Sequence, residues 1–454
     1  MRERVEKSVA ELKKFFATGA TKDVDFRLRQ LTKLKIAILA HQKEIETALW
    51  SDLRKSSEET YLTEIGIVLH EIDTQMKHLR RWARPKKVSS PLVLFPSSSK
   101  IVYEPLGVAL IIAPWNYPFH LTINPLVGAI AAGCCAMVKP SPASGATSRI
   151  MEVIIKECFE SSYIDIVQGR RDVNALLLEQ RYDIIFFTGS PSLAKIVCQS
   201  AAKNLTPTIL ELGGKSPCIV DSDAAIDVAA RRIAWGKLLN VGQTCIAPDY
   251  LFVHDSVKDR LLEAIKKSII EMYGKEPKES RFFPRIINDA AYERLVGYIK
   301  HSDIYYGGQR DPKERYIAPT IIDNVKESDP IMQEEIFGPI LPVMTFDSMD
   351  QVYSYVGSRE KPLALYYFGS NADQVLRNTS AGGGCINDTI MHITNDQLPF
   401  GGVGNSGMGR YHGHHSFLAF SNHRAVVTTP TWIDLPLKYV PYSFFKLVKW
   451  VMSL

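Results

Sequence analysis

The chain has 454 residues, of which 46% are hydrophobic and 23% are charged, and its formal net charge is +5. This composition is ordinary for a soluble globular protein, and the length predicts two or three domains rather than a single core. The positive charge is too dilute to predict a nucleic-acid partner. Its densest cluster, Arg80–Lys87, is interpreted as a solvated helix end.

The seven cysteines do not form a recognisable framework. Their number is odd, no C-x-x-C motif occurs, and no Cys/His pair has the spacing of a zinc site. We therefore expect free thiols and no metal. The charged, helical N-terminus is unlike a signal peptide, and no run of 18 apolar residues occurs. A reducing, cytoplasmic location is the expectation that fits these features.

In chain order, the first 84 residues are predicted to be helical, because apolar residues recur at intervals of three and four in 5–16 and 60–82. Proline and serine in 83–100 predict a linker or an exposed hairpin. Short apolar runs that end in Gly, Pro or Ser then alternate with helical stretches, which is typical of buried parallel strands. The runs are 108–114, 136–141, 164–169 and 184–190, followed by a second series at 216–223, 250–256, 339–346 and 363–370. The predicted fold class is α/β with two parallel sheets.

Two segments are candidates for phosphate binding. The run 402–407 matches G-x-G-x-x-G, but the dinucleotide fingerprint needs an acidic residue about 20 positions further on. None occurs between Asp396 and Asp434, so a glycine-rich loop beside a site is preferred. A strand that ends at Gly189 and Ser190, with a helix starting at Pro191, is the better candidate. The free N–H groups of such a helix bind anions, although a plain capped turn has the same pattern.

Three residues are candidates for chemistry. Cys245 lies in "GQTCIAP", and a thiolate nucleophile needs nearby backbone N–H groups and space, although a buried cysteine is often only a core residue. Gly242 would let the backbone approach closely. Glu211 ends an apolar run and is followed by two glycines, so it could reach a cleft or simply lie at the surface. Asn116 could donate to an oxyanion or form an Asx turn.

Eight motifs, taken together, resemble the aldehyde dehydrogenase superfamily and its class 3 branch in particular. They are "PWNYP", "VKPS", "FFTGS", "ELGGKSP", "GQTCIAPDY", "EEIFGP", "GGGCINDTIMH" and "LPFGGVGNSGMGRYHG", which occur in the family's order between about residues 100 and 424. The resemblance implies that Cys245 is the nucleophile and Glu211 the general base. It also implies that Asn116 and the backbone N–H of Cys245 form the oxyanion hole. Aldehydes, aromatic or of medium to long aliphatic chain, would become carboxylic acids through a cysteine thiohemiacetal and a thioester.

The resemblance further implies a dinucleotide cofactor, NAD or NADP, bound without the usual glycine fingerprint. The implied binding residues are Trp115, Lys139, Gly189, Ser190, Glu335 and Phe337. Many family members carry an acidic residue in the "KPS" segment that repels a 2′-phosphate. This chain has Pro142 there instead, so we expect use of NADP as well as NAD.

The resemblance also implies a division of the chain. A cofactor-binding domain would comprise 1–84 and 103–210, a catalytic domain 211–418, and an oligomerisation arm with the C-terminal tail 85–102 and 419–454. A homodimer is the expected assembly, and Tyr117 and Trp235 are expected to line the aldehyde tunnel. The apolar tail after Pro441 would either pack on the protein or make a weak contact with a membrane surface.

Three alternatives to this enzyme remain open from sequence. A relative that passes the acyl group to coenzyme A would generally lack a base at Glu211. A cysteine hydrolase without redox chemistry would need a histidine partner for Cys245. A non-catalytic descendant would have no reason to retain Cys245, Glu211 and Asn116 together.

Overall fold

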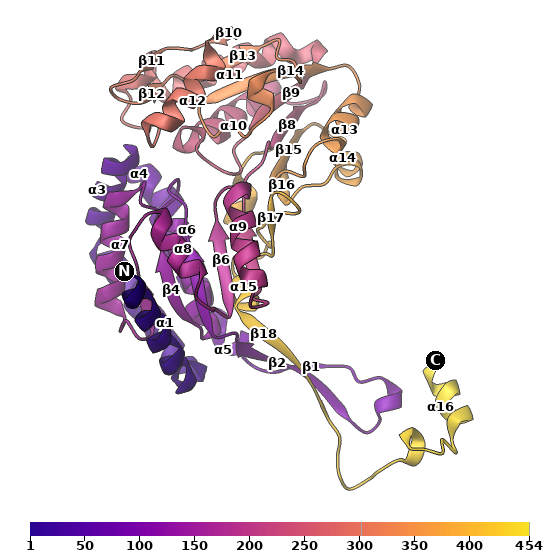
Figure 1. The fold of residues 1–454 in the computed structure, drawn as a ribbon. Helices are drawn as coiled ribbons and strands as arrows, with labels where there is room; N and C mark the ends of the chain where they lie inside the picture. The colour runs from indigo at the N-terminus through magenta and orange to yellow at the C-terminus, as the bar shows by residue number, and fades with distance from the viewer. Residues whose placement is uncertain (301, 454) are drawn as a thin grey trace.

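The computed structural model describes residues 1–300 and 302–453. Two lobes, each built on a mostly parallel sheet, lie one above the other, and a three-stranded arm projects from the lower lobe (Figure 1). The predicted α/β class with two parallel sheets is confirmed.

Helices dominate the first 82 residues, as the periodicity predicted. They are α1 (Arg2–Ala17), α2 (Val24–Ala40), α3 (Gln42–Leu53), α4 (Ser57–Thr60) and α5 (Gly66–Trp82), with a π-helical turn at Tyr61–Ile65. Asp23 caps α2 by accepting hydrogen bonds from the amides of Asp25 and Phe26. The helices bury their apolar faces in the core of the lower lobe.

The sheet of the lower lobe has six strands in the order β17-β7-β6-β3-β4-β5. They are β3 (Val108–Ile112), β4 (Cys135–Lys139), β5 (Ile164–Ile166), β6 (Ile184–Thr188), β7 (Thr208–Glu211) and the antiparallel β17 (Gly407–Met408). The helices that alternate with them are α6 (His120–Ala132), α7 (Gly145–Cys158), α8 (Arg171–Leu178) and α9 (Pro191–Ala202). Every residue of β3, β4 and β6 is buried, which explains their uninterrupted apolar runs.

The sheet of the upper lobe has seven strands in the order β10-β13-β14-β9-β8-β15-β16. They are β8 (Pro217–Val220), β9 (Tyr250–His254), β10 (Asp303–Tyr306), β13 (Thr320–Asp323), β14 (Ile340–Phe346), β15 (Ala364–Phe368) and β16 (Gly383–Ile386). Only the β10–β13 pair within this sheet is antiparallel. Its helices are α10 (Ile226–Leu238), α11 (Lys258–Tyr273), α12 (Asp289–Ile299), α13 (Met349–Gly357) and α14 (Ala372–Asn378), and a small ribbon joins β11 (Arg310–Asp311) and β12 (Tyr316–Ile317).

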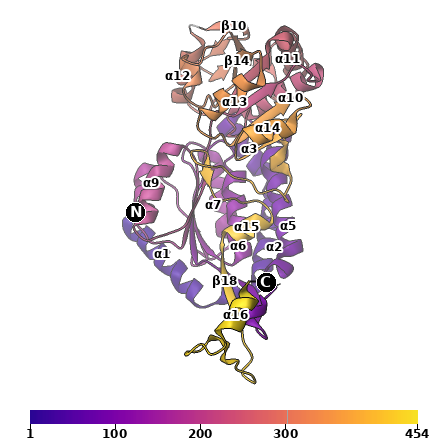
Figure 2. The same cartoon turned by 90° about the vertical axis from the view of Figure 1, so that its right-hand side faces the viewer.

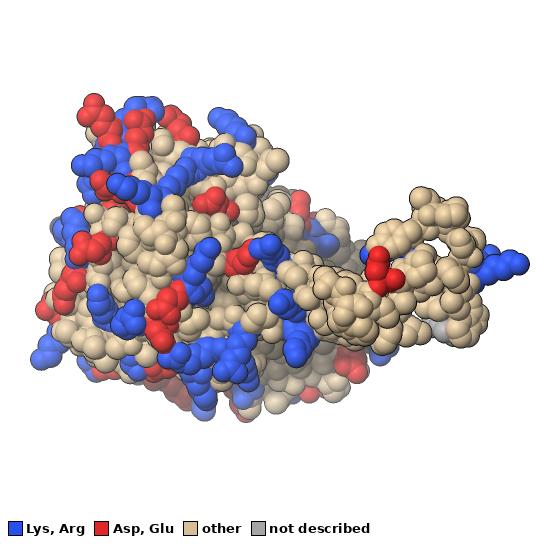
Figure 3. Space-filling view, turned by 90° about the horizontal axis from the view of Figure 1, so that it is seen from below, with Lys and Arg blue, Asp and Glu red and all other residues tan. Residues whose placement is uncertain are grey.

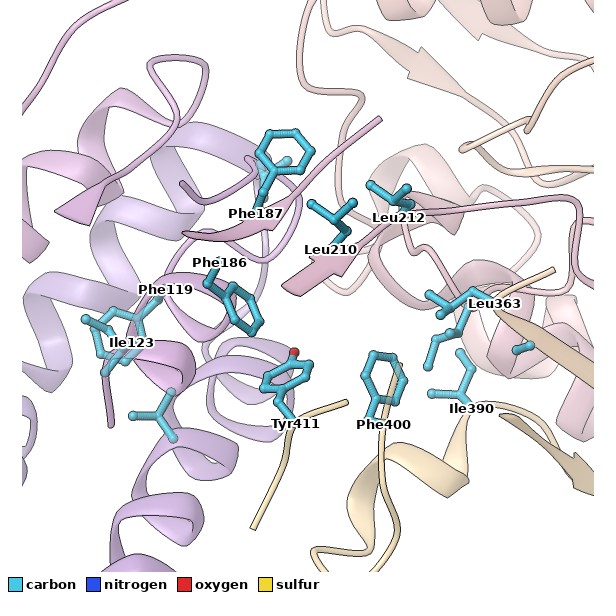
Figure 4. Close-up of a cluster of buried hydrophobic side chains, with 14 of the residues drawn as sticks. Phe119, Ile123, Phe186, Phe187, Leu210, Leu212, Leu363, Ile390, Phe400 and Tyr411 are labelled. Carbon is cyan, nitrogen blue, oxygen red and sulfur yellow. The ribbon is translucent and has the colours of Figure 1, made fainter. Parts of the chain in front are cut away.

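A buried apolar cluster continues from one lobe to the other (Figure 4). Phe186 and Leu210 come from the lower sheet, and Leu363 and Ile390 come from the upper lobe. Tyr411 lies on the segment between β17 and α15 (His414–Ala419). The two lobes therefore share one buried apolar core.

The arm pairs two segments that are far apart in the sequence. β1 (Lys86–Val88) pairs with β2 (Ser98–Pro105), and β18 (Ser421–Thr428) pairs with β2 along its whole length. The segment 83–100 is thus an exposed hairpin, one of the two forms expected for it. The tail beyond β18 ends in α16 (Phe445–Met452), which lies beside the arm and away from the body (Figures 1 and 2). None of the described helices is long and apolar enough to cross a membrane.

Candidate active site

Cys245 lies on the irregular segment between α10 and β9, and it is partly exposed in a cavity of about 540 Å³. Burial raises the pKa of its thiol, and the nearby carboxyls of Glu335 and Glu211 raise it further. The backbone amides of Cys245 and Ile246 act in the opposite direction. The resting thiol is therefore neutral, and the two amides favour the thiolate once a proton leaves.

Gly242 brings the segment before Cys245 close to the neighbouring backbone, as the sequence predicted. Its φ is +73°, and a Cβ there would collide with the carbonyl oxygens of Gly338 and Lys237. A residue with a side chain could not adopt this path without moving the nucleophile.

Asn116 lies directly beside this segment. Its side-chain Nδ2 donates to the Gln243 carbonyl over 3.0 Å, and its own carbonyl accepts from Asn240 Nδ2 over 2.8 Å. The hydroxyls of Tyr117 and Thr244 are 2.6 Å apart. The Asn116 amide and the segment that carries Cys245 thus come together from two lobes of the molecule, and donors placed in this way can serve an oxyanion.

A buried ion pair, which sequence reasoning missed, supports the Asn116 loop. Lys55 Nζ is 2.6 Å from Glu64 Oε1, and both side chains are fully buried. Glu64 Oε2 accepts from the amides of Phe119 and His120 over 2.9 and 3.0 Å. The available signal was an acidic residue within the apolar periodicity of 60–82, a position that requires a buried partner.

Glu211, at the end of β7, is 3% exposed, and neither carboxyl oxygen has a hydrogen-bond partner among the described residues. Burial raises its pKa well above the ordinary value, and the Arg410 guanidinium opposes this only in part. Buried polar groups are nearly always paired, so an unpaired carboxyl beside a cysteine indicates a group that awaits water or substrate.

Three of the expected cofactor residues, Lys139, Gly189 and Ser190, lie at or just after the carboxyl ends of β4 and β6, the two strands that flank β3. Lys139 ends β4, its Nζ donates to the Pro140 carbonyl over 2.7 Å, and burial lowers its pKa to about 8. Ser190 caps α9, and the Gly189 amide donates to the Glu211 carbonyl over 3.0 Å. Helix α9 starts just after β6, and Glu211 is the last residue of β7. The helix start and the candidate base therefore lie at the ends of two paired strands.

The other three expected cofactor residues are Trp115, Glu335 and Phe337. The rings of Trp115 and Phe337 meet edge to face, with centroids 5.4 Å apart. Phe337 has a positive φ of 53°. Burial and Asp249 raise the pKa of Glu335 to about 8. A Cβ at Gly213 would collide with a Glu335 carboxyl oxygen, so the glycine lets this carboxyl lie against the backbone.

The loop that carries Glu335 and Phe337 is braced from three directions. Asp249 Oδ1 accepts from the Ile336 amide over 2.8 Å, and Arg294 donates to the carbonyls of Glu335 and Ile336 over 3.2 and 2.6 Å. Lys215 Nζ donates to the Glu334 carbonyl over 2.9 Å.

A second cavity, of about 320 Å³, lies between the start of α9 and the loop that carries Glu335. It is bordered by Pro191 at the start of α9, by Gly213 and by Glu335. A helix N-terminus, a position without a side chain and a braced acid along one cavity fit a dinucleotide. Among residues 1–300 and 302–453, no group of three or more His, Cys, Asp or Glu side chains is arranged to hold a metal ion.

The cavity at Cys245 is lined mainly by apolar and aromatic side chains. Tyr117 and Trp235 are among them, as the sequence predicted. The other large apolar lining residues are Leu62, Ile67, Leu121, Leu239, Ile246, Met272, Tyr273, Phe282, Ile390, Met391, Ile393 and Phe400.

Known aldehyde dehydrogenases are similar to this protein over nearly the whole chain. The profile of the aldehyde dehydrogenase family matches residues 1–426. The 4,4'-diaponeurosporen-aldehyde dehydrogenase of Staphylococcus aureus (strain NCTC 8325 / PS 47) is 46% identical over 98% of both chains. Aldehyde dehydrogenase family 3 member B1 of Mus musculus is 45% identical over 96% of this chain and 95% of its own. The rat dimeric NADP-preferring aldehyde dehydrogenase (Rattus norvegicus) is 45% identical over 93% and 94%.

A solved structure described as the substrate-bound state of Staphylococcus aureus AldH superposes with a TM-score of 0.97, at 46% identity over 99% of both chains. The class 3 resemblance expected from the motifs is confirmed by these relatives. The chain belongs to the aldehyde dehydrogenase family, and it is an NAD(P)-dependent oxidoreductase that acts on aldehydes.

Proposed function

We propose that Cys245, Glu211 and Asn116 are the catalytic residues, and that they oxidise lipophilic aldehydes to carboxylic acids. The observation that carries this proposal is the unpaired, buried Glu211 carboxyl in a site that also holds Cys245, at a largely apolar cavity. Neither a structural cysteine nor a surface glutamate explains that combination.

In the proposed reaction, the Cys245 thiol gives its proton to water in the cavity and the sulfur adds to the aldehyde carbon. Asn116 Nδ2 turns from the Gln243 carbonyl to the new oxyanion, which also accepts from the Cys245 amide. A donor of this kind typically contributes about 10²–10³ in turnover. A dinucleotide held by the cofactor residues would supply a hydride acceptor, and the cysteine adduct would become a thioester by losing hydride to it.

Glu211 then completes the reaction as a general base. Its ionised carboxylate takes a proton from water, the water oxygen adds to the thioester carbon, and the Cys245 sulfur leaves as the acid forms. Such a base contributes about 10²–10⁴. The presence of Glu211 favours hydrolysis over transfer to coenzyme A, so added coenzyme A should not accelerate turnover.

The aldehydes proposed are aromatic or of medium to long aliphatic chain. Support comes from the aromatic and aliphatic lining of the 540 Å³ cavity and from the Staphylococcus aureus relative, which is named for 4,4'-diaponeurosporen-aldehyde. A panel of aldehydes of graded chain length tests this proposal. kcat/KM should rise with chain length, and a preference for short polar aldehydes would contradict it.

For the cofactor, we propose that Trp115, Lys139, Gly189, Ser190, Glu335 and Phe337 hold either NAD or NADP. Pro142 is exposed and presents no carboxylate to a 2′-phosphate, and the rat relative is named as NADP-preferring. Kinetics with both dinucleotides test this directly. Complete rejection of NADP would mean that the discriminating group lies elsewhere.

We further propose the domain division 1–84 with 103–210, 211–418, and 85–102 with 419–454, with the β1-β2-β18 arm joining two copies of the chain. The projection of the arm from the body and the dimeric name of the rat relative support this. Light scattering on the full chain and on a chain lacking 421–454 tests the arm. We also propose a reducing, cytoplasmic location, which the seven free thiols support.

The tail is proposed to touch an anionic membrane surface. Its exposed side chains include Trp432, Phe445, Trp450 and Met452, and no acidic residue follows Asp434. The projecting arm and tail carry few charged side chains (Figure 3). A helix of eight residues is about 12 Å long, too short to cross a bilayer core of about 30 Å. Interfacial binding is the membrane contact left open.

Co-sedimentation with phosphatidylserine vesicles tests this contact. The full chain should bind, salt should weaken the binding, and truncation after Pro441 should abolish it. A full chain that stays in the supernatant, with a truncated chain that loses its dimer, would assign the tail to assembly instead.

The catalytic assignment is tested by Cys245→Ser in a cofactor-reduction assay, with and without coenzyme A. Loss of nearly all activity with retained cofactor binding is the expected result. A fully active serine variant would remove Cys245 from the mechanism.

A further inference from the structure

The turn that leads into Cys245 has a strained backbone. Three successive residues have positive φ: Asn240 at 50°, Val241 at 57° and Gly242 at 73°. Glycine adopts this region freely, but a β-branched residue such as Val241 does so only where its surroundings hold it. The position of Cys245 therefore depends on the contacts of this turn.

Part of the support comes from the nucleophile's own lobe and from the Asn116 loop. Asn240 Nδ2 donates to the carbonyls of Asn116 and Gln243 over 2.8 and 3.1 Å. Gln243 Oε1 accepts from the Ile287 amide over 3.0 Å, and its Nε2 donates to the Arg285 carbonyl over 3.1 Å. These bonds hold side chains on both sides of Val241.

The backbone of the turn has a further partner, which comes from the N-terminal helices. The Asn240 amide donates to Glu59 Oε1 over 2.8 Å, a contact between residues 181 positions apart. Asn240 is fully buried, so its amide has no contact with solvent while Glu59 is in place. Glu59 itself is fixed on α4, where Ser56 Oγ accepts from its amide over 3.2 Å.

Glu59 also lines the cavity into which Cys245 is exposed. We propose that Glu59 is a positioning residue, whose carboxyl oxygen holds the Asn240 amide and with it the turn that presents Cys245 to the aldehyde. This inference rests on the proposed role of Cys245 as the nucleophile. The wall that shapes the aldehyde cavity then also sets the position of the attacking sulfur.

The contact needs an acceptor oxygen at the right distance rather than a full charge. Burial raises the pKa of Glu59 to about 7, with Lys55 and the Asn240 amide opposing and Glu64 adding to the shift. A carbonyl oxygen remains available to the amide in either protonation state. Glutamine keeps that oxygen, methionine has a similar length without it, and aspartate keeps the charge but is one methylene shorter.

The experiment compares Glu59→Gln, Glu59→Met and Glu59→Asp in the full-length enzyme with one aldehyde and one dinucleotide. Met and Asp should lower kcat about tenfold, which corresponds to about 1.4 kcal/mol, and should change the aldehyde KM much less. Gln should restore kcat to near the wild-type value. The rate at which iodoacetamide alkylates Cys245, followed by mass spectrometry, should fall and recover in the same order, because the thiolate loses its aligned amides.

Glu44→Met is the matched control, because Glu44 lies on the preceding helix α3, pairs with His41 at the surface and is not among the residues that line the cavity at Cys245. Its kcat and alkylation rate should stay within about twofold of wild type, as for most exposed ion pairs. A loss in the control equal to that in Glu59→Met would assign the effect to a general disturbance of the N-terminal helices and overturn the proposal.

Several other results would contradict the proposed role of Glu59. Unchanged turnover in Glu59→Met, or unchanged or faster alkylation of its Cys245, overturns the proposal, and so does a glutamine variant as slow as the methionine variant. If circular dichroism shows that Glu59→Met does not fold, the comparison of Glu59→Asp with Glu59→Gln is sufficient. Wild-type kinetics in Glu59→Asp would show that the side chain does not need to reach the Asn240 amide, which overturns the proposal. Activity in Cys245→Ser would instead contradict the proposed function, and is thereby distinguished.

Discussion

Replacing Glu211 by glutamine should separate the two halves of the proposed reaction. The amide nearly matches the carboxyl in shape but cannot accept a proton from water. We therefore expect thioester formation to persist and its hydrolysis to slow by about 10²–10⁴-fold. Rapid mixing should release one equivalent of reduced cofactor per active site, followed by a slow steady rate.

The buried position of Glu211 also predicts that the substitution changes how the stability of the protein depends on pH. Its pKa is raised in the folded protein because burial penalises the charged carboxylate. Between its ordinary pKa and this raised value, the folded state binds more protons than the unfolded chain. Stability therefore falls as pH rises through this window, by up to about 1.4 kcal/mol per pH unit from this group. Glutamine does not titrate, so the stability of Glu211→Gln should fall less than that of wild type as pH rises through this window.

Three measurements check these predictions. Stopped-flow absorbance of the reduced cofactor gives the burst and the steady rate, and single-turnover hydrolysis of the thioester is followed against pH. The wild-type hydrolysis rate should rise up to about tenfold per pH unit below the pKa of Glu211, and the variant should lack this component. Thermal unfolding at the same pH values compares how the two transition temperatures change with pH.

Either of two results would refute this reasoning. Steady turnover of Glu211→Gln equal to that of wild type would mean that another group takes the proton of water. An identical pH dependence of unfolding in the two proteins would mean that Glu211 is not held in the neutral form by burial.

Three further outcomes are expected. In wild type, iodoacetamide should alkylate Cys245 ahead of the other cysteines when a limiting amount is followed by peptide mass mapping, and prior modification of another cysteine would contradict its assignment. Pro142→Glu should lower kcat/KM for NADP more than for NAD, because a carboxylate near a 2′-phosphate is repelled, and an equal loss for both would place the 2′-position elsewhere. Lys55→Met should destabilise the protein by about 3–5 kcal/mol in urea unfolding, because it leaves Glu64 buried without its cation, and Lys55→Met with Glu64→Gln should recover part of that loss. A double variant no more stable than Lys55→Met would argue against an uncompensated charge at Glu64.

Much of the fold was predictable because the relevant signals are local. A strand buried on both faces requires an unbroken apolar run, so 108–112, 135–139 and 184–188 were recognisable from their residues. The start of α9 was equally clear, since Ser190 and Pro191 favour a helix start whatever lies around them.

The candidate site was predictable only in part. Cys245, Glu211 and Asn116 were named from motifs, but their separate contexts allowed bland interpretations of each. Their convergence comes from strand pairing and lobe packing, such as the alignment of Thr188 with Glu211 across β6 and β7. The sequence could not show that Glu211 is unpaired, because the absence of a partner is a property of all the neighbours at once.

What the sequence determined by itself was the order of helices and strands and the chemical types at the site. Only the tertiary structure placed Glu59 against the Asn240 amide, Lys55 against Glu64, and β18 along β2. The physical reason is that periodicity and capping act over a few residues of one segment. Burial, hydrogen-bond partners and the resulting pKa values are set by contacts between separate elements of the fold, which no local pattern encodes.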